Sequence, residues 1–133
     1  GVIIRTAACL EFPLHIIKPL SFSMTDKRFK GAVMDYLSHC DLNIHNDWED
    51  FMIYCKNENK RLILATTKTN NSFYDYDFKY GDIVLFGKET SGVPDNIHKT
   101  LKEKITIPMN TKTRSLNLAT SVAIVASKII SQL

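Results

Sequence analysis

Hydrophobic and polar positions along this chain follow two alternating periods, which predicts short strands interleaved with helices. Toward the C-terminus apolar residues recur three and four positions apart, as one helix face requires: Leu116, Ala119, Val122, Ala123, Ala126, Ile129 and Ile130. This pattern predicts helices at 2–10, 26–35, 47–58, 94–101 and 116–131. Short apolar runs bounded by polar segments predict strands at 14–18, 41–45, 61–66, 82–86 and 104–107. Such alternation indicates an α/β fold with helices around a parallel sheet.

The segment from Ile107 to Ser121, reading IPMNTKTRSLNLATS, joins a predicted strand to the last predicted helix through a polar loop without glycine. Pro108 and the polar run at 110–113 end the strand, and Ser115 is expected to cap the helix that follows. The N-terminus of a helix presents free backbone N–H groups to whatever its loop encloses. We therefore expect this loop to contact a ligand.

A second segment of the same kind runs from Ile83 to Pro94 and reads IVLFGKETSGVP. Its apolar run breaks at Gly87, which we expect to allow close backbone approach to a ligand, and Glu89 supplies an acceptor. Gly92 is expected to end the turn, with Pro94 starting the next helix. Taken alone, each of the two segments is also what an ordinary strand-to-helix connection would contain.

Composition fits one compact domain. The chain has 133 residues with 44% hydrophobic content, enough to bury a core. No window is long and apolar enough for a membrane span and no signal-peptide pattern opens the sequence, so we expect a cytoplasmic protein. Cys9, Cys40 and Cys55 have no C-x-x-C spacing and apolar neighbours, and we interpret them as reduced structural thiols. No metal site is predicted, because the histidines lack ligand spacing: His15, His39, His45 and His98.

The formal net charge of +3 is weak evidence for a nucleic-acid partner, and the positions of the charges matter more. Lysines 99, 102 and 104 are interpreted as a solvated surface. Three cations in or near the candidate loops are instead predicted to contact phosphates: Arg28, Lys112 and Arg114. A nicotinamide-dinucleotide site is disfavoured, because no G-x-G-x-x-G turn is present.

Three motifs in this order resemble those of the SPOUT methyltransferases, a knotted family that uses S-adenosylmethionine. They are GVIIR at 1–5, FGKETSG at 86–92, and IPM at 107–109 with RSLNLA at 114–119. Further matches extend the resemblance over essentially the whole chain: LHIIKP at 14–19, DKR at 26–28, MDY at 34–36 and ATTK at 65–68. The resemblance implies a parallel-sheet SPOUT fold with a C-terminal trefoil knot.

Within the family, the chain is similar to small single-domain enzymes that methylate the ribose 2′-hydroxyl of the wobble nucleotide of certain leucine tRNAs. The resemblance implies that S-adenosylmethionine is held mainly by the backbone of five residues: Ala65, Gly87, Ile107, Ser115 and Leu116. It implies catalytic roles for Arg5, Ser115 and Asn117. The last two can also be simple caps.

From the residues alone, Arg5 would be an exposed helical arginine without a role, beside a buried face carrying Val2, Ile3 and Cys9. The resemblance places it next to the target ribose. A guanidinium stays protonated in proteins, so we expect Arg5 to hold the adjacent phosphate and stabilise the forming alkoxide. Phosphate or water would then take the proton.

Several points remain open at this level. Alternatives are a SPOUT ribose methyltransferase for ribosomal RNA or another tRNA position, and a non-catalytic RNA-binding module of the same fold. The identity of the methylated base is left open, because Lys88 and Ser91 depart from the family pattern.

We expect residues 1–133 to form one domain that lacks the family's first strand and part of its first motif. A homodimer is expected through the first and last helices, with these apolar residues exposed: Ile3, Ile129 and Leu133.

Overall fold

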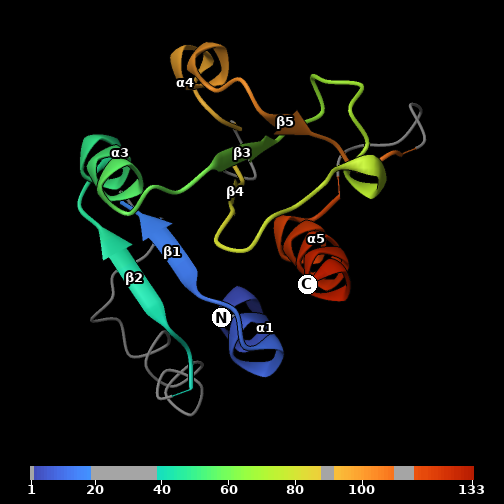
Figure 1. Cartoon of the computed structure of the whole chain (residues 1–133), viewed down its shortest axis with the longest axis horizontal. Helices are drawn as coiled ribbons and strands as arrows, with labels where there is room; N and C mark the ends of the chain where they lie inside the picture. Colours follow the sequence, from blue (N-terminus) through green and yellow to red (C-terminus); the bar gives the residue numbers. More distant parts are fainter. Residues whose placement is uncertain (1, 19–38, 88–91, 110–115) are drawn as a thin grey trace. The chain divides into compact units, whose positions relative to one another are not determined.

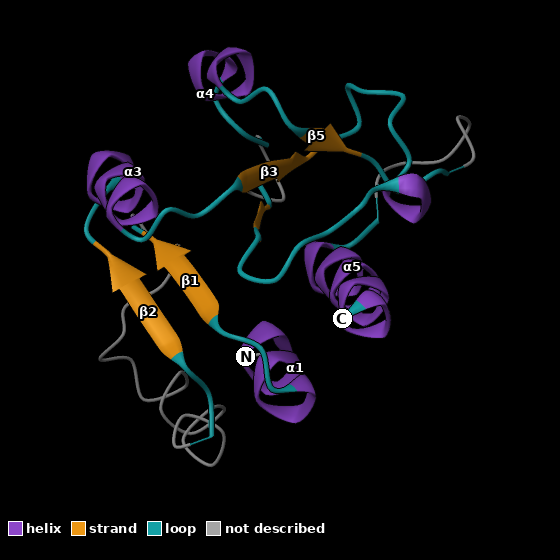
Figure 2. Ribbon diagram, viewed as in Figure 1, coloured by secondary structure: helices purple, strands orange, loops and turns teal. Residues whose placement is uncertain are grey.

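The computed structural model describes residues 2–18, 39–87, 92–109 and 116–133. The chain divides into two compact units, Gly1–Glu58 and Asn59–Leu133, and the strand pairs among the described residues are all parallel. Figure 1 labels the elements along the chain, and Figure 2 distinguishes helices from strands. The predicted α/β class with parallel strands is confirmed.

The first unit contains helix α1 (Val2–Leu10), strand β1 (Leu14–Ile17), strand β2 (Leu42–His45) and helix α3 (Trp48–Asn57). The two strands pair in register along their whole length, from Leu14 opposite Leu42 to Ile17 opposite His45. The side chain of Asp47 starts α3 by accepting a hydrogen bond of 2.8 Å from the Asp50 amide.

Helix α1 buries a face different from the expected one. Ile4 and Ala7, three positions apart, are the buried residues of this helix. Val2 is 66% exposed and Cys9 is also exposed, so the prediction of a buried Val2, Ile3 and Cys9 face is wrong. The error arises because apolar residues occupy most positions of this short helix, and composition then does not select a face.

The second unit is built on a three-stranded sheet of order β4-β3-β5. Its strands are β3 (Leu62–Ala65), β4 (Ile83–Leu85) and β5 (Lys104–Ile105). Its helices are the 3-10 turn η1 (Phe73–Asp75), α4 (Asp95–Thr100) and α5 (Leu118–Gln132). Beyond β5 a single bridge pairs Ser72 with Thr106.

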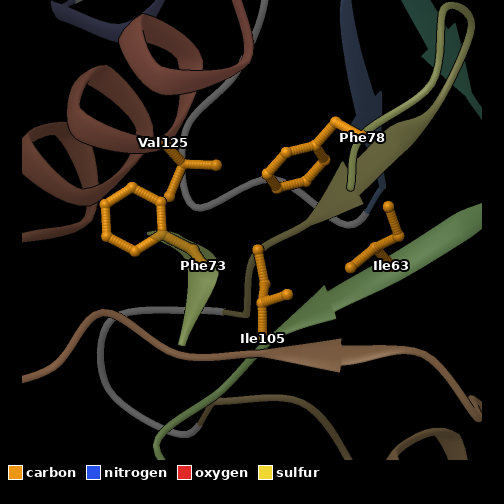
Figure 3. Close-up of a cluster of buried hydrophobic side chains, with 5 residues drawn as sticks. All are labelled: Ile63, Phe73, Phe78, Ile105 and Val125. Atoms are coloured by element: carbon orange, nitrogen blue, oxygen red, sulfur yellow. The ribbon is translucent and has the colours of Figure 1, made fainter. Parts of the chain in front are cut away.

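The core of the second unit brings together side chains from the sheet, the segment after β3, and α5. Its fully buried members are Ile63, Phe73, Phe78, Ile105 and Val125 (Figure 3). Ile63 and Ile105 come from neighbouring strands, while Val125 comes from α5. Burying a side chain of this size contributes about 1.5–3 kcal/mol, so this cluster anchors α5 and the η1 segment to the sheet.

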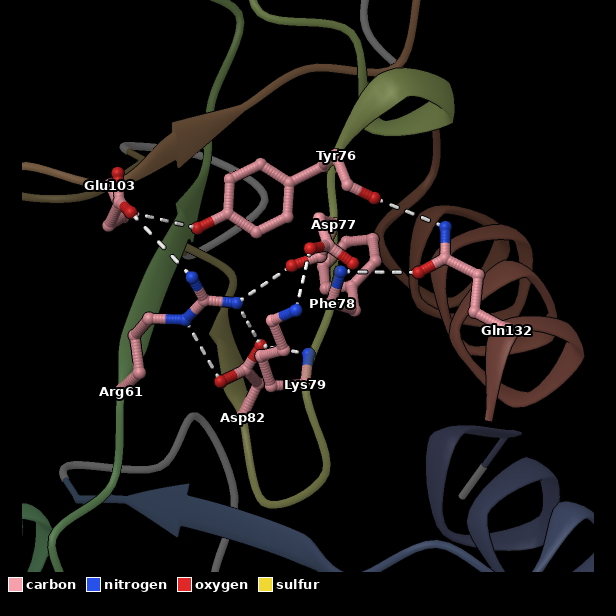
Figure 4. A network of polar contacts seen from close by, with 8 residues as sticks. All are labelled: Arg61, Tyr76, Asp77, Phe78, Lys79, Asp82, Glu103 and Gln132. Atoms are coloured by element: carbon pink, nitrogen blue, oxygen red, sulfur yellow. Dashed lines mark hydrogen bonds and ion pairs between the residues drawn. The ribbon is translucent and has the colours of Figure 1, made fainter.

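A polar network fixes the segment that connects β3 to β4 (Figure 4). The Arg61 guanidinium donates through Nε to Oδ1 of Asp82 at 3.0 Å and through Nη2 to the Asp77 carbonyl at 3.0 Å. Asp82 is almost completely buried, so this pairing compensates the cost of burying its charge. From α5, the Gln132 side chain donates to the Tyr76 carbonyl at 3.1 Å and accepts from the Phe78 amide at 3.2 Å.

Cys9, Cys40 and Cys55 form no disulfide; Cys55 is buried, Cys40 is half-buried and Cys9 is exposed. Burial and the neighbouring Asp41 carboxylate raise the pKa of the Cys40 thiol. Among the described residues, no helix is both long and apolar enough to cross a membrane. In the same part of the chain, histidine, cysteine and acidic side chains form no group of three that could hold a metal ion.

Observed element bounds agree with the predicted ones within one or two residues at most ends. The predicted helix at 26–35 lies outside the described residues. The described strands form two separate sheets in place of the single sheet expected, and η1 was not predicted.

Candidate functional site

The carboxyl ends of the three strands in the second unit lie at one edge of the sheet, because all three strands are parallel. Ala65 ends β3, Gly87 follows β4 by two residues, and Ile107 follows β5 by two residues. All three residues are half-buried. Ligands of open α/β sheets bind at this edge, so the structure brings three of the predicted binding residues to one place that suits a ligand.

Gly87 is required by a contact within the chain. A Cβ atom at this position would lie 2.6 Å from the carbonyl carbon of Gly92 and 2.6 Å from the amide nitrogen of Val93. Both are backbone atoms, which cannot rotate away as a flexible side chain could. Close approach of two backbone segments at this edge is thus one reason for the glycine, and close approach to a ligand stays a prediction.

Gly92 and Pro94 behave as predicted at the end of this loop. Gly92 has a φ of +67°, a left-handed conformation that favours glycine. Pro94 is the N-cap of α4, which begins at Asp95. Glu89, the acceptor expected in this loop, lies outside the described residues.

The loop after β3 is attached both to β5 and to α4. The Thr66 amide donates to the Ile105 carbonyl at 2.9 Å, and the Thr66 hydroxyl accepts from the Lys68 amide at 3.2 Å. The same hydroxyl lies 3.1 Å from Nε2 of His98 on α4. His98 was expected only not to be a metal ligand, and no local signal in the sequence indicates that α4 contacts this loop.

The N-terminus of α5 differs from its prediction. Asn117 is the N-cap, since its Oδ1 accepts from the amides of Ala119 at 2.9 Å and Thr120 at 3.3 Å. A helix beginning at 116 behind a Ser115 cap is therefore wrong. Leu116 precedes the helix and its side chain is 39% exposed. The capping role foreseen for Asn117 is the one its side-chain oxygen performs.

The remaining predicted site residues divide between the first unit and the segments that are not described. Arg5 lies on α1 in the first unit, and its side chain is exposed. Four residues fall outside the described ranges: Arg28, Lys112, Arg114 and Ser115. The structure therefore brings together Ala65, Gly87 and Ile107, and the catalytic roles remain predictions.

A pair of histidines in the first unit also went unpredicted. His15 of β1 and His45 of β2 stack with their ring centroids 5.2 Å apart, and Nδ1 of His15 lies 3.0 Å from Nε2 of His45. Tyr54 of α3 lies 5.1 Å from the His15 ring centroid. In such a contact one ring nitrogen donates and the other accepts, and the tautomers decide which does which.

The sequence matches the family described as SpoU rRNA Methylase over residues 1–127. It is 36% identical, over 99% of its length, to the tRNA (cytidine(34)-2'-O)-methyltransferase of Ancylobacter novellus, of which it covers 84%. It is 38% identical to the protein of the same name from Yersinia pestis, over 94% of this chain and 80% of that one.

The fold is similar to solved structures of this class. One, described as giving structural insights into the 2-OH methylation of C/U34 on tRNA, superposes with a TM-score of 0.91 at 35% identity and covers 99% of this chain and 86% of that one. The SpoU methyltransferase AviRb from Streptomyces viridochromogenes has a TM-score of 0.87 over 99% of this chain and 53% of that one. Its 20% identity supports the fold alone. The match along nearly the whole chain, together with this fold, shows that the chain belongs to the SpoU rRNA methylase family.

Proposed function

We propose that this chain is an S-adenosylmethionine-dependent methyltransferase that modifies the ribose 2′-hydroxyl of nucleotide 34, the wobble position, of tRNA. The observation that carries the proposal is the 36% identity, over 99% of the chain, to a protein named for this reaction. Leucine tRNAs are the substrates that the resemblance to the wobble-nucleotide enzymes implies. The expected location is the cytoplasm, where tRNA is available.

The carboxyl edge of the second unit suits the donor. Ala65, Gly87 and Ile107 combine half-buried apolar surface with backbone groups, and the adenine of the donor is a flat, uncharged ring that such surroundings can hold. S-adenosylmethionine, when bound, supplies a methyl group on a positively charged sulfur that an oxygen nucleophile can accept. We assign Ser115 and Leu116 to complete this site, as the resemblance implies.

Cationic residues are assigned to bind the RNA substrate. Arg5 is proposed to hold the phosphate beside nucleotide 34 and to stabilise negative charge that develops on the 2′-oxygen, while phosphate or water accepts the proton. Lys112, Arg114 and Arg28 are proposed to contact further phosphates. Asn117 uses its Oδ1 to cap α5, so any contact it makes with substrate would come from its amide nitrogen.

We also propose a C-terminal trefoil knot, one SPOUT domain over residues 1–133, and a C₂ homodimer. The knot and the single domain are supported by the family resemblance. The dimer is supported by exposed apolar side chains on α1, on α5 and at the C-cap of α5: Val2 at 66%, Ile130 at 46% and Leu133 at 59%. Ile3 and Ile129, also expected at the interface, are half-buried in the chain.

The matched family description names ribosomal RNA, which keeps a ribosomal substrate as the second candidate. A methyl-transfer assay distinguishes the two candidate substrates: the purified protein is incubated with labelled S-adenosylmethionine and either a leucine tRNA transcript or a ribosomal RNA fragment. Calorimetry then measures donor binding. We expect methyl transfer to the tRNA. Transfer to the ribosomal fragment alone would favour the second candidate, and donor binding without transfer to either RNA would favour a non-catalytic module.

A further inference from the structure

A half-buried side-chain contact joins the loop that follows β3 to helix α4. The hydroxyl oxygen of Thr66 lies 3.1 Å from Nε2 of His98, and both residues are half-buried. Thr66 directly follows Ala65, and His98 lies on α4, which begins three residues after Gly92. The contact therefore links the loop that leaves the carboxyl edge after β3 to helix α4.

The hydrogen bonds of Thr66 restrict its side chain. Its hydroxyl oxygen accepts from the Lys68 amide at 3.2 Å, and its own amide donates to the Ile105 carbonyl at 2.9 Å. A hydroxyl has one donor and two acceptor positions, so it can serve Lys68 and His98 together in either tautomer of the imidazole. With both partners in place, the rotamer of Thr66 and the turn from Thr66 to Lys68 are held in one arrangement.

The second link between the same two segments is much weaker. Nζ of Lys68 lies 3.8 Å from Oδ1 of Asp95, with both side chains largely exposed. Exposed pairs of this kind contribute about 0–1 kcal/mol. The half-buried contact between Thr66 and His98 is therefore the stronger of these two connections.

We propose that His98 is a positioning residue for the donor site: by holding Thr66, it fixes the loop beginning at Ala65 relative to α4 and so sets the shape of the sheet edge that receives S-adenosylmethionine. The inference depends on the proposed function for the identity of the ligand. His98 acts through Thr66 and makes no contact with donor or RNA in this account. Its removal should weaken donor binding without abolishing methyl transfer at saturating donor.

The first test needs no donor. Amide hydrogen exchange measured by NMR compares the wild type with His98→Leu and with His98→Gln, which keeps a polar group near the position of Nε2. A net hydrogen bond contributes about 1 kcal/mol, so we expect the Lys68 amide to exchange roughly fivefold faster in His98→Leu. The Thr66 amide, which bonds to Ile105 in the sheet, serves as the internal control and should not change. Equal exchange of Lys68 in His98→Leu and the wild type would overturn the proposal.

The second test measures the donor dissociation constant by calorimetry for His98→Leu, Thr66→Val and the double variant. Lys99→Ala, a neighbouring exposed side chain on α4, is the matched control. We expect each single variant to weaken binding about fivefold, the double variant to be no weaker than either single one, and His98→Gln to restore most of the affinity. Unchanged kcat with a raised KM for the donor would agree with a positioning role.

The outcomes separate this inference from the proposed function. Tight donor binding by the wild type with unchanged binding by His98→Leu would refute the role of His98 and leave the function intact. Additive losses in the double variant would also refute it, because two independent effects would then be at work. A wild type that binds no donor would refute the proposed function and the donor role of His98 together, even where the exchange result showed that His98 holds the loop.

Discussion

Gly87→Ala is predicted to lower both stability and donor affinity, through backbone contacts that no rotamer change can relieve. The new Cβ would lie 2.6 Å from the Gly92 carbonyl carbon and 2.6 Å from the Val93 nitrogen, whereas carbon atoms in contact prefer about 3.5–4.0 Å. The backbone at Gly92 must therefore shift by roughly 1 Å. Overpacking of this kind typically costs about 1–3 kcal/mol.

The expected consequences are measurable by thermal unfolding and by calorimetry. For a domain of this size, the melting temperature should fall by roughly 4 °C for each kcal/mol lost. Donor affinity should fall by about tenfold or more, because a displacement near 1 Å at a binding edge disturbs several contacts at once.

Gly81→Ala provides the matched control for this substitution. Gly81 precedes β4, at the opposite end of the strand from Gly87, and has a φ of +91°. Its replacement costs roughly 1–2 kcal/mol in backbone strain, with only Lys60 Nζ nearby at 3.5 Å from the new Cβ. It should lower the melting temperature and leave donor affinity unchanged. The reasoning would be refuted by a Gly87→Ala protein with wild-type affinity, or by equal losses of affinity in both variants.

Three further outcomes are expected. Arg5→Ala should reduce kcat by about 10²–10³, through loss of charge stabilisation, and leave the donor dissociation constant within twofold; wild-type turnover would contradict this assignment. Asn117→Ala should destabilise the protein by about 1 kcal/mol in urea unfolding, whereas Asn117→Asp, which keeps the capping oxygen, should not; equal losses would argue against the cap. The pKa of Tyr76 is raised to about 12: burial is the main cause, Arg61 lowers the pKa, and the hydrogen bond to Glu103 raises it. A raised pKa in the folded state stabilises the fold below the unfolded value near 10, and this stabilisation is lost as the pH rises toward 12. In Tyr76→Phe, stability should therefore fall less between about pH 10 and pH 12. An ultraviolet titration of the variant should also lack the phenolate absorbance change that occurs at the highest pH.

The periodic elements could be predicted because burial on one face leaves a regular pattern in the sequence. Helix α1 was predicted with its observed bounds, and β3 to within one residue at each end. Local competition at the ends was harder to foresee: Ser115 and Asn117 are both good caps, and only the hydrogen bonds of Asn117 identify it as the one used.

Contacts between distant segments could not be predicted from periodicity. Phe73 is fully buried in the core, yet it lies in a three-residue turn without any repeating pattern. The need for glycine at position 87 was foreseen, but the partner atoms, in Gly92 and Val93, were not. His98 lies on a six-residue helix, and its contact with Thr66 depends on how that helix folds back toward β3, which no local pattern encodes.

The central claim is that the protein methylates the 2′-oxygen of nucleotide 34. Its most direct test compares two leucine tRNAs that differ only in that oxygen. One carries a ribose and the other a 2′-deoxyribose at nucleotide 34, and both are incubated with the protein and S-adenosylmethionine before mass mapping of nuclease fragments. The account predicts one added methyl group, located on nucleotide 34 of the ribose-containing tRNA, and none on its deoxy counterpart. Equal methylation of both tRNAs, or a methyl group at any other nucleotide, would contradict it.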